Sequence, residues 1–145
     1  MISTGCPNLK IVEFNKANVY TLPEKLFEDN DKLEEVALTS NRFTSLPDDL
    51  FKETGRLRTL DLYRNEITTL GSRVFRNLRK LKSLDLNRNV IAQLDNNVFF
   101  ALEDLERLDL RQNQLEFDDS SGIKWQSMEK IKYLDLSKNR IRITG

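Results

Sequence analysis

Aliphatic residues recur along this chain at a fixed interval, a pattern that few folds can accommodate. Successive blocks begin 24 residues apart, at Leu9, Leu33, Leu57, Leu81 and Leu105, and a sixth begins at Ile131 after 26 residues. A period of this length is typical of a solenoid, in which each block forms one turn and stacks on the next. The sequence therefore predicts one domain over residues 1–145 with six stacked turns, in which residues 1–8 are the remnant of a preceding turn.

Each block contains a short alternating segment followed by a longer irregular one. In the third block Leu60 and Leu62 alternate with Asp61 and Tyr63, which is the two-residue period of a strand with one buried face. So short a strand needs neighbours, and we expect parallel strands stacked about 4.8 Å apart. The rest of each block would return along the convex side as loop or helical turn. The predicted fold class is α/β, a horseshoe-shaped solenoid with a concave parallel sheet.

The wording of the blocks resembles the leucine-rich repeat. Leu57, Leu60, Leu62 and Asn65 spell the pattern Leu-x-x-Leu-x-Leu-x-x-Asn, and the repeats extend over residues 9–143. Such a repeat is an architecture and not a chemistry. It therefore predicts the fold and leaves the partner open.

Two further columns of the repeat are expected to be structural. Side-chain amides eight residues after a block start can satisfy backbone groups of their own turn and of the adjacent turn. This predicted ladder comprises Asn41, Asn65, Asn89, Asn113 and Asn139. Ala17 stands at the ladder position of the first block, so that turn must satisfy its backbone in another way. A predicted spine of buried rings comprises Phe27, Phe51, Phe75, Phe99 and Trp125.

The charge balance argues against some classes of partner. The net charge is zero and the pI is about 6.4, so the chain as a whole has no long-range attraction to nucleic acid or to an anionic membrane. No apolar run approaches the roughly 18 residues that span a bilayer, and the first residues lack the features of a signal peptide. We expect no nucleic-acid partner, and a membrane contact only through a segment outside this sequence.

Residues that would support catalysis or metal binding are scarce. The chain contains no histidine, which removes Ser-His and Cys-His nucleophile pairs, and it has no glycine-rich phosphate loop. A superficial calcium loop begins at Asp118, but Ile123 stands where that loop requires glycine. An open sheet also excludes no water from a carboxylate pair such as Asp61 and Asp85. We expect neither an enzyme, nor a cofactor, nor a metal site.

Cys6 is the single cysteine, so it has no disulfide partner within this chain. It stands three residues before a block start, in the slot that Leu78, Leu102 and Met128 occupy in later blocks. This position predicts a small buried apolar side chain, and a free or intermolecular thiol is the alternative. The sequence also contains no Asn-x-Ser/Thr site, so neither feature settles the compartment.

Both ends of the sequence are expected to be open. Capping elements usually close the core of leucine-rich repeat domains, and none is recognisable here, so the chain is interpreted as a segment of a longer ectodomain. Exposed apolar residues are expected at Ile2 and Leu9 at one end and at Ile141 and Ile143 at the other. Such edges predict self-association, fusion to caps, or fraying.

The outward positions of the strands form the candidate binding surface. Carboxylates recur there at Asp61, Asp85 and Asp109. Neighbouring carboxylates repel by roughly 1 kcal/mol per pair in water, so a cation or a basic partner would be favourable; a solvated ladder without any ligand is the competing interpretation. Tyrosine and arginine are enriched at interface hot spots. The candidate ligand-binding residues are Asp61, Tyr63, Asp85, Asn87, Asp109, Arg111 and Tyr133, and the rival lateral residues are Arg42, Glu66 and Gln114.

A more specific resemblance rests on four short segments. Cys6-Pro7-Asn8-Leu9, residues 46–51, Trp125 and residues 134–139 together resemble the ectodomain of insect Toll and Toll-like receptors. The resemblance implies an innate-immune or developmental receptor at the cell surface, which binds a cystine-knot cytokine of the Spätzle type and signals through a cytoplasmic TIR domain. No contact residue of that family can be transferred, because contact positions are not part of the repeat motif.

Two other classes of protein remain open. One is a secreted, soluble leucine-rich repeat scaffold of arthropod immunity, and the other is an intracellular leucine-rich repeat adaptor. All three share these repeats. Capping cysteines, a membrane helix or a TIR domain in flanking sequence would discriminate among them.

Overall fold

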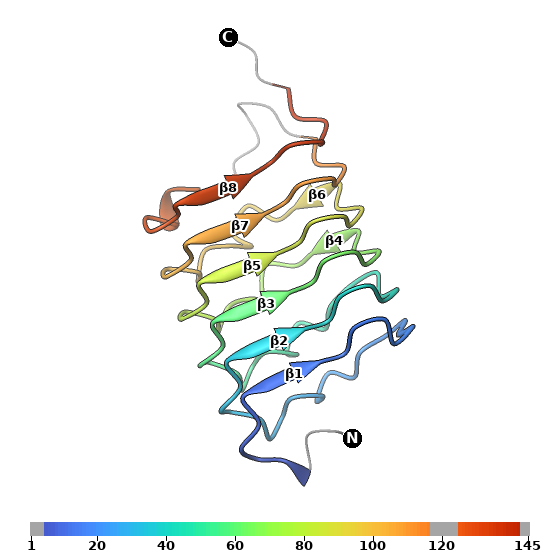
Figure 1. Ribbon diagram of the computed structural model, residues 1–145. Coiled ribbons are helices and arrows are strands. Elements are labelled where there is room, and N and C mark those ends of the chain that lie inside the picture. The colour runs from blue at the N-terminus through green and yellow to red at the C-terminus, as the bar shows by residue number, and fades with distance from the viewer. Residues whose placement is uncertain (1–4, 117–124, 143–145) are drawn as a thin grey trace.

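The computed structural model describes residues 5–116 and 125–142 of the chain. Its main element is a six-stranded parallel sheet to which each turn of a solenoid contributes one strand (Figure 1). In sheet order the strands are β1 (Ile11–Glu13), β2 (Glu35–Ala37), β3 (Thr59–Asp61), β5 (Ser83–Asp85), β7 (Arg107–Asp109) and β8 (Tyr133–Asp135). This arrangement confirms the predicted parallel-sheet solenoid.

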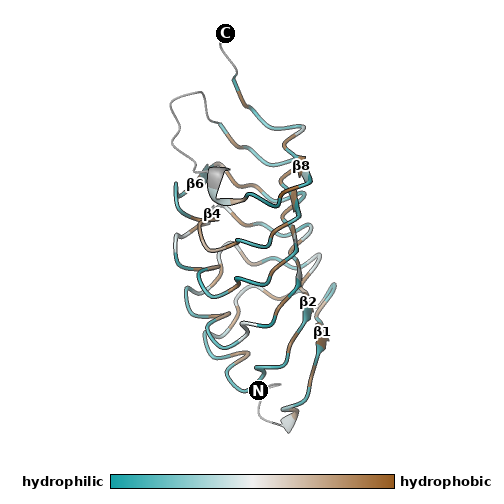
Figure 2. Cartoon of the chain, turned by 90° about the vertical axis from the view of Figure 1, so that its left-hand side faces the viewer, coloured by the Kyte–Doolittle hydropathy of each residue, from teal (hydrophilic) through white to brown (hydrophobic). Residues whose placement is uncertain are grey.

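The strands pair in register, so equivalent residues of successive turns lie side by side. Leu60 of β3 pairs with Val36 of β2 on one side and with Leu84 of β5 on the other. These side chains point inward, as do Leu62 and Leu86 two residues later, and all five are buried. The core is therefore one continuous row in which each turn covers the leucines of its neighbours. Figure 2 shows hydrophobic segments recurring in the stacked turns.

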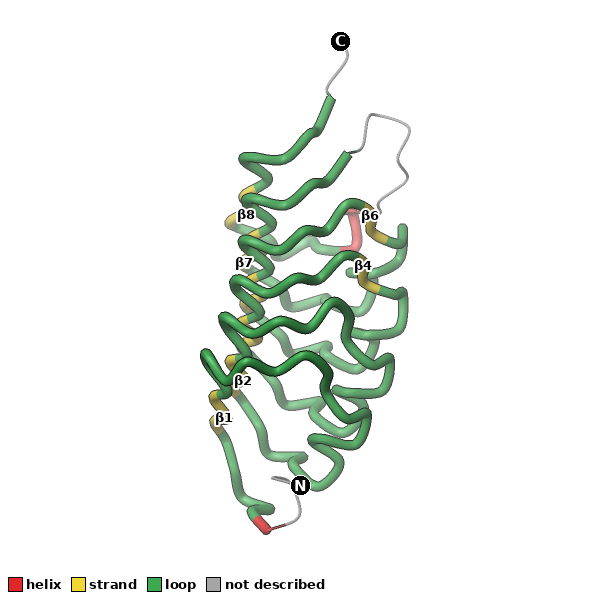
Figure 3. The backbone as a smooth tube through the Cα atoms, turned by 90° about the vertical axis from the view of Figure 1, so that its right-hand side faces the viewer, coloured by secondary structure: helices red, strands yellow, loops and turns green. Residues whose placement is uncertain are grey.

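The side of the solenoid opposite the main sheet is irregular (Figure 3). The elements described there are a two-stranded sheet of β4 (Thr69–Leu70) and β6 (Gln93–Leu94) and a short 3-10 helix, η2 (Trp125–Ser127). The predicted aromatic rings lie beneath this side: the centroids of Phe27 and Phe51 are 6.1 Å apart, and those of Phe99 and Trp125 are 6.2 Å apart. The rings thus fill the space between the return segments and the leucine row.

Asparagine side chains connect each turn to the turn before it. The Nδ2 of Asn89 donates to the carbonyl oxygens of Leu62 at 3.0 Å and Leu86 at 3.1 Å. Its Oδ1 accepts from the N–H of Ile67 at 3.2 Å. Corresponding bonds from Nδ2 to the preceding turn are made by Asn41, Asn65, Asn113 and Asn139. In the first turn, Asn41 Oδ1 accepts from the N–H of Ala17, just as Asn65 Oδ1 accepts from the N–H of Asn41 one turn later, so the backbone at Ala17 is satisfied from the next turn.

The residue before each ladder position, including Ala17, has a left-handed backbone conformation. Its φ lies between 54° and 57° at Lys16, Ser40, Arg64, Arg88, Gln112 and Lys138. Because a Cβ destabilises this conformation by about 1–2 kcal/mol per residue, a glycine would be expected there, yet none occurs. The hydrogen bonds of the strand on one side and of the asparagine on the other hold the turn in place.

Cys6 is exposed, so the prediction of a buried side chain is wrong. Leu78, Leu102 and Met128 occupy the same slot in later turns and are buried. Cys6 belongs to the first described turn and has a neighbouring turn on one side. The backbone of Cys6, and not its side chain, contacts the next turn, since its carbonyl oxygen accepts from Asn30 Nδ2 at 3.0 Å.

The apolar residues expected at the two ends are only partly described. Leu9 and Ile141 are half-buried, and Ile2 and Ile143 lie outside the described residues. On β8, Leu134 is 42% exposed, although the leucines that precede it in the same column are buried. Leu134 is therefore the described core-column side chain that is open to solvent at this end.

Candidate interaction surface on the sheet

The outward side chains of the six strands and of the residues just after them form three columns, together called the sheet face. The first column comprises Ile11, Glu35, Thr59, Ser83, Arg107 and Tyr133. The second comprises Glu13, Ala37, Asp61, Asp85, Asp109 and Asp135. The third comprises Asn15, Thr39, Tyr63, Asn87, Arg111 and Ser137. All seven candidate ligand-binding residues lie in these columns.

The aspartates of the second column stabilise the backbone turn after each strand and also give the surface negative charge. One oxygen of each carboxylate accepts a hydrogen bond from the N–H two residues later. The pairs are Asp61 with Tyr63, Asp85 with Asn87, Asp109 with Arg111 and Asp135 with Ser137, at 2.8 to 3.0 Å. Such bonds stabilise the turn that leaves the strand and fix the third-column residue. Reasoning from charge repulsion alone missed this role.

Asp85 lies at the centre of the acidic column, between Asp61 of β3 and Asp109 of β7. Burial raises the pKa of its carboxyl from 3.8 to about 6. The N–H of Asn87 opposes this rise, the negative charges of Asp61 and Asp109 add to it, and Arg107 opposes it. The folded chain therefore holds this carboxylate partly desolvated and among like charges.

We expect Asp85→Asn to raise the free energy of unfolding at pH 7 by about 1 kcal/mol, allowing for solvent screening of a half-exposed group. Asparagine keeps the acceptor for Asn87 N–H and removes the charge. Between about pH 4 and pH 6 the unfolded chain has lost a proton that folded Asp85 keeps, so stability of the parent falls as pH rises. Urea titrations at pH 4 and pH 7 should show the variant's gain at pH 7 and none at pH 4.

Asp135→Asn is the matched control, because its expected effect on the free energy of unfolding has the opposite sign. Hydrogen bonds from the Ser137 hydroxyl and N–H hold the pKa of the Asp135 carboxyl below its usual range. Its charge therefore stabilises the folded state above that range, and its removal should destabilise the chain at pH 7. A gain of stability in both variants would show that general charge reduction, not the position of Asp85, is responsible.

Arg107, Asp109 and Tyr133 form a cluster where β7 meets β8. The guanidinium carbon of Arg107 lies 4.4 Å from the ring centroid of Tyr133, and its Nη2 is 3.6 Å from Asp109 Oδ2. The Tyr133 hydroxyl donates to Asp135 Oδ2 at 3.2 Å. Tyr133 is 43% exposed and held at two points, whereas Asp109 is 5% exposed. The sequence marked Asp109 as a contact, yet Asp109 is buried and supports Arg107, which positions Tyr133.

The third column offers a second group of candidates. Tyr63, Asn87 and Arg111 are half-buried, and the guanidinium of Arg88 lies 6.0 Å from the ring centroid of Tyr63. Asn87 Oδ1 and Arg111 Nε are buried without a hydrogen-bond partner among the described residues. Buried polar atoms without partners are unfavourable. A partner that reorients these two side chains would satisfy both atoms.

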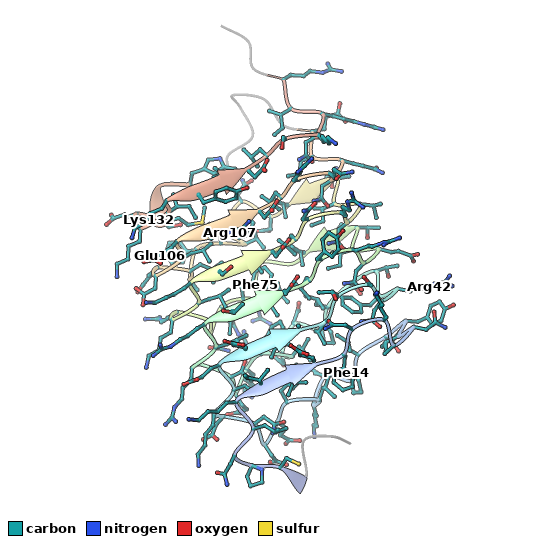
Figure 4. The ribbon with its side chains drawn as sticks, in the orientation of Figure 1. Phe14, Arg42, Phe75, Glu106, Arg107 and Lys132 are labelled. Carbon is teal, nitrogen blue, oxygen red and sulfur yellow. The ribbon has the colours of Figure 1, made fainter. Side chains whose placement is uncertain are left out.

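The rival lateral site also contains an ordered tyrosine. Arg42 lies on the lateral side of the solenoid (Figure 4). Its Nη1 donates to the Tyr20 hydroxyl at 2.7 Å, and its guanidinium lies 5.5 Å from the Tyr20 ring. Tyr20 was not among the sequence candidates, although it precedes Arg42 by 22 residues on the adjacent turn. Glu66 and Gln114 are exposed. This lateral pair supplies a matched comparison for Tyr133.

Within residues 5–116 and 125–142, no three Cys, His, Asp or Glu side chains are grouped so as to hold a metal ion. The calcium-loop candidate from Asp118 to Ile123 lies outside those ranges. No helix in the described part of the chain is both long and apolar enough to span a bilayer.

Comparison with solved structures supports the fold over almost the whole chain. The leucine-rich repeat domain of APL1 superposes with a TM-score of 0.85 over 96% of this chain at 19% identity, which shows the fold alone. A chain of a TLR13–ssRNA13 complex superposes with a TM-score of 0.87 over 94% of this chain at 31% identity. A chain of the Drosophila Toll–Spatzle complex does so with a TM-score of 0.71 over 85% at 30% identity. The resemblance to Toll-like receptors is thereby confirmed.

This chain spans only part of those proteins: 35% of the APL1 chain, 19% of the TLR13 chain and 17% of the chain in the Toll–Spatzle complex. No protein with a curated description matches it. A family model described as leucine rich repeat matches residues 31–91, 55–115 and 79–141, which overlap to cover most of the sequence. The chain therefore belongs to the leucine-rich repeat family.

Proposed function

We propose that this chain is part of the ectodomain of a Toll-type receptor and binds a protein ligand through its sheet face. Leucine-rich repeat domains are generally non-catalytic modules for interaction. The 30% identity to a chain of the Toll–Spatzle complex supports the receptor type and suggests a Spätzle-like cytokine as the ligand. The same likeness supports an extracellular or cell-surface location.

The geometry of Tyr133 carries the proposal. Binding normally immobilises an exposed side chain at an entropic cost of about 0.5–1.5 kcal/mol. Tyr133 avoids much of this cost, because Arg107 stacks on its ring and Asp135 accepts from its hydroxyl before any partner arrives. An ordered aromatic ring beside an arginine is the composition typical of an interface hot spot.

The neighbouring columns extend the surface beyond one residue. Arg111 and Asn87 offer unpaired polar atoms, and Tyr63, after β3, adds a second aromatic ring three strands away from β8. Asp61 and Asp85 supply negative charge, which complements a basic ligand surface. We assign Asp109 to the support of Arg107 and not to direct contact.

Tyr133→Ala should weaken binding of a Spätzle-type cytokine at least tenfold, because truncation of a central hot spot costs about 2 kcal/mol or more. The measurement is biolayer interferometry on the complete ectodomain. Thermal unfolding should change little, since the removed ring is exposed.

Tyr20→Ala is the control, because Tyr20 is also an exposed tyrosine that contacts an arginine, but on the lateral side. The affinity of the Tyr20→Ala variant for the cytokine should stay within about twofold of that of the parent. If Tyr20→Ala abolishes binding and Tyr133→Ala does not, the lateral side is the site and the sheet face is not.

A further inference from the structure

Basic side chains gather on the side of the solenoid where the strands begin. Arg56 and Arg58 flank the buried leucine that opens the third block, and Lys80 and Lys82 flank the leucine that opens the fourth. The N–H of Lys82 donates to the carbonyl oxygen of Arg58 at 2.8 Å, so the two turns are adjacent here. With Arg79 these residues are called the strand-start cluster. All five are exposed.

No ion pair among the described residues neutralises this cluster, although Lys82 and Lys80 lie close enough to Asp104 to add to the effect of Lys130 in lowering the pKa of its carboxyl. None of the five side chains forms an ion pair or hydrogen bond with another described residue. In the fifth block the same positions carry Asp104 and Glu106, which pair with Lys130 at 2.8 Å and Lys132 at 3.6 Å. Figure 4 shows Glu106 and Lys132 together at this side of the sheet. The third and fourth blocks thus retain the unpaired positive charge.

Acidic residues limit the cluster at both ends of the two turns. The N–H of Arg58 donates to the carbonyl oxygen of Glu34 at 2.8 Å, and the N–H of Glu106 donates to that of Lys82 at 2.9 Å. Turns are about 4.8 Å apart, so the positive surface is narrow. A flat anionic membrane would meet Glu34 and Glu106 as well. A thin, linear polyanion can contact the cations and avoid both acids.

We propose that the strand-start cluster binds a sulfated polysaccharide. Clustered lysine and arginine residues are typical of heparin-binding surfaces, and arginine forks match oxyanions with two parallel hydrogen bonds. Single-stranded nucleic acid fits less well, because binding of its bases relies on aromatic stacking and the cluster contains no aromatic residue. This site goes beyond the proposed recognition of a protein ligand and shares with it only the extracellular location.

The test uses a size-defined heparin oligosaccharide, titrated calorimetrically into the protein at physiological salt. Binding to the parent should weaken at least tenfold in the double variant Arg58→Gln/Lys82→Gln. The control Lys25→Gln/Lys52→Gln removes the same charge from two exposed lysines on the convex side and should change affinity less than twofold. Thermal unfolding of both double variants should match the parent, because all four side chains are exposed.

A gain of affinity provides an independent check. Glu106→Gln removes the acid next to Lys82 and should therefore tighten heparin binding. If the Glu106–Lys132 ion pair were merely structural, its loss would not tighten binding. The proposal is overturned if heparin does not bind, if both double variants weaken it equally, or if an oligothymidine of equal charge binds more tightly than heparin. Cytokine binding through Tyr133 should be unchanged in every variant, so failure here is separate from failure of the sheet-face proposal.

Discussion

Phe99→Ala is expected to lower the free energy of unfolding by about 3–5 kcal/mol, the range for removal of a large buried aromatic side chain. Phe99 is 2% exposed, and its ring centroid lies 6.2 Å from that of Trp125. Alanine would leave a cavity between the return segments and the leucine row. Because neighbouring turns close on the ring from both sides, the cavity cannot collapse without moving a turn. Urea unfolding followed by circular dichroism measures the loss.

The adjacent residue supplies the control for this prediction. Phe100 is 62% exposed, so Phe100→Ala makes the same chemical change one position later with little change in burial. The free energy of unfolding of this variant should stay within about 0.5 kcal/mol of that of the parent. Equal losses in the two variants would contradict the assignment of Phe99 to the buried spine.

Asn89→Ala is expected to cost about 1–3 kcal/mol, since it leaves the buried Ile67 N–H without its acceptor and removes one of the two asparagine donors at the Leu62 and Leu86 carbonyl oxygens. The Leu62 and Leu86 carbonyl oxygens and the Ile67 N–H all lose their bonds to this side chain. Hydrogen exchange should show faster exchange of the Ile67 amide, which identifies the lost acceptor directly.

Asn96→Ala is the matched control for the ladder. Asn96 is exposed and belongs to the return segment of the same block. The substitution is chemically identical, and we expect no measurable change in the urea midpoint or in exchange of the Ile67 amide. A loss at Asn96 as large as that at Asn89 would show that the ladder bonds do not determine stability.

The sequence predicted the fold well because its main determinants are periodic. The leucine spacing indicated which positions face inward, and Leu60 and Leu84 do pair on neighbouring strands. The hydrogen-bonding capacity of an amide side chain also indicated which backbone groups an asparagine such as Asn89 could satisfy. These inferences depend on the residue type and its place in the repeat, and both are visible in one sequence.

Features that depend on geometry between turns could not be predicted in this way. The left-handed conformation of Arg64 and Arg88 has no glycine to mark it. The support of Tyr133 by Arg107 depends on side-chain rotamers of two residues in different turns. The exposure of Cys6 could not be predicted from its slot in the repeat, in which Leu78 and Met128 are buried. The ligand-binding role of the sheet face stays a prediction, because an outward position specifies exposure and not a partner.

The direction of the asparagine bonds has a consequence for synthesis of the chain. Asn89 Oδ1 accepts from the buried N–H of Ile67, which lies 22 residues earlier, and Asn113 Oδ1 accepts likewise from the N–H of Ile91. A turn that emerges from the ribosome therefore lacks partners for buried backbone groups until the following turn has been made. At about 5–20 residues per second, this delay is about 1–5 seconds per turn. During elongation the newest turn is always the incomplete one, and each new asparagine completes the turn made before it.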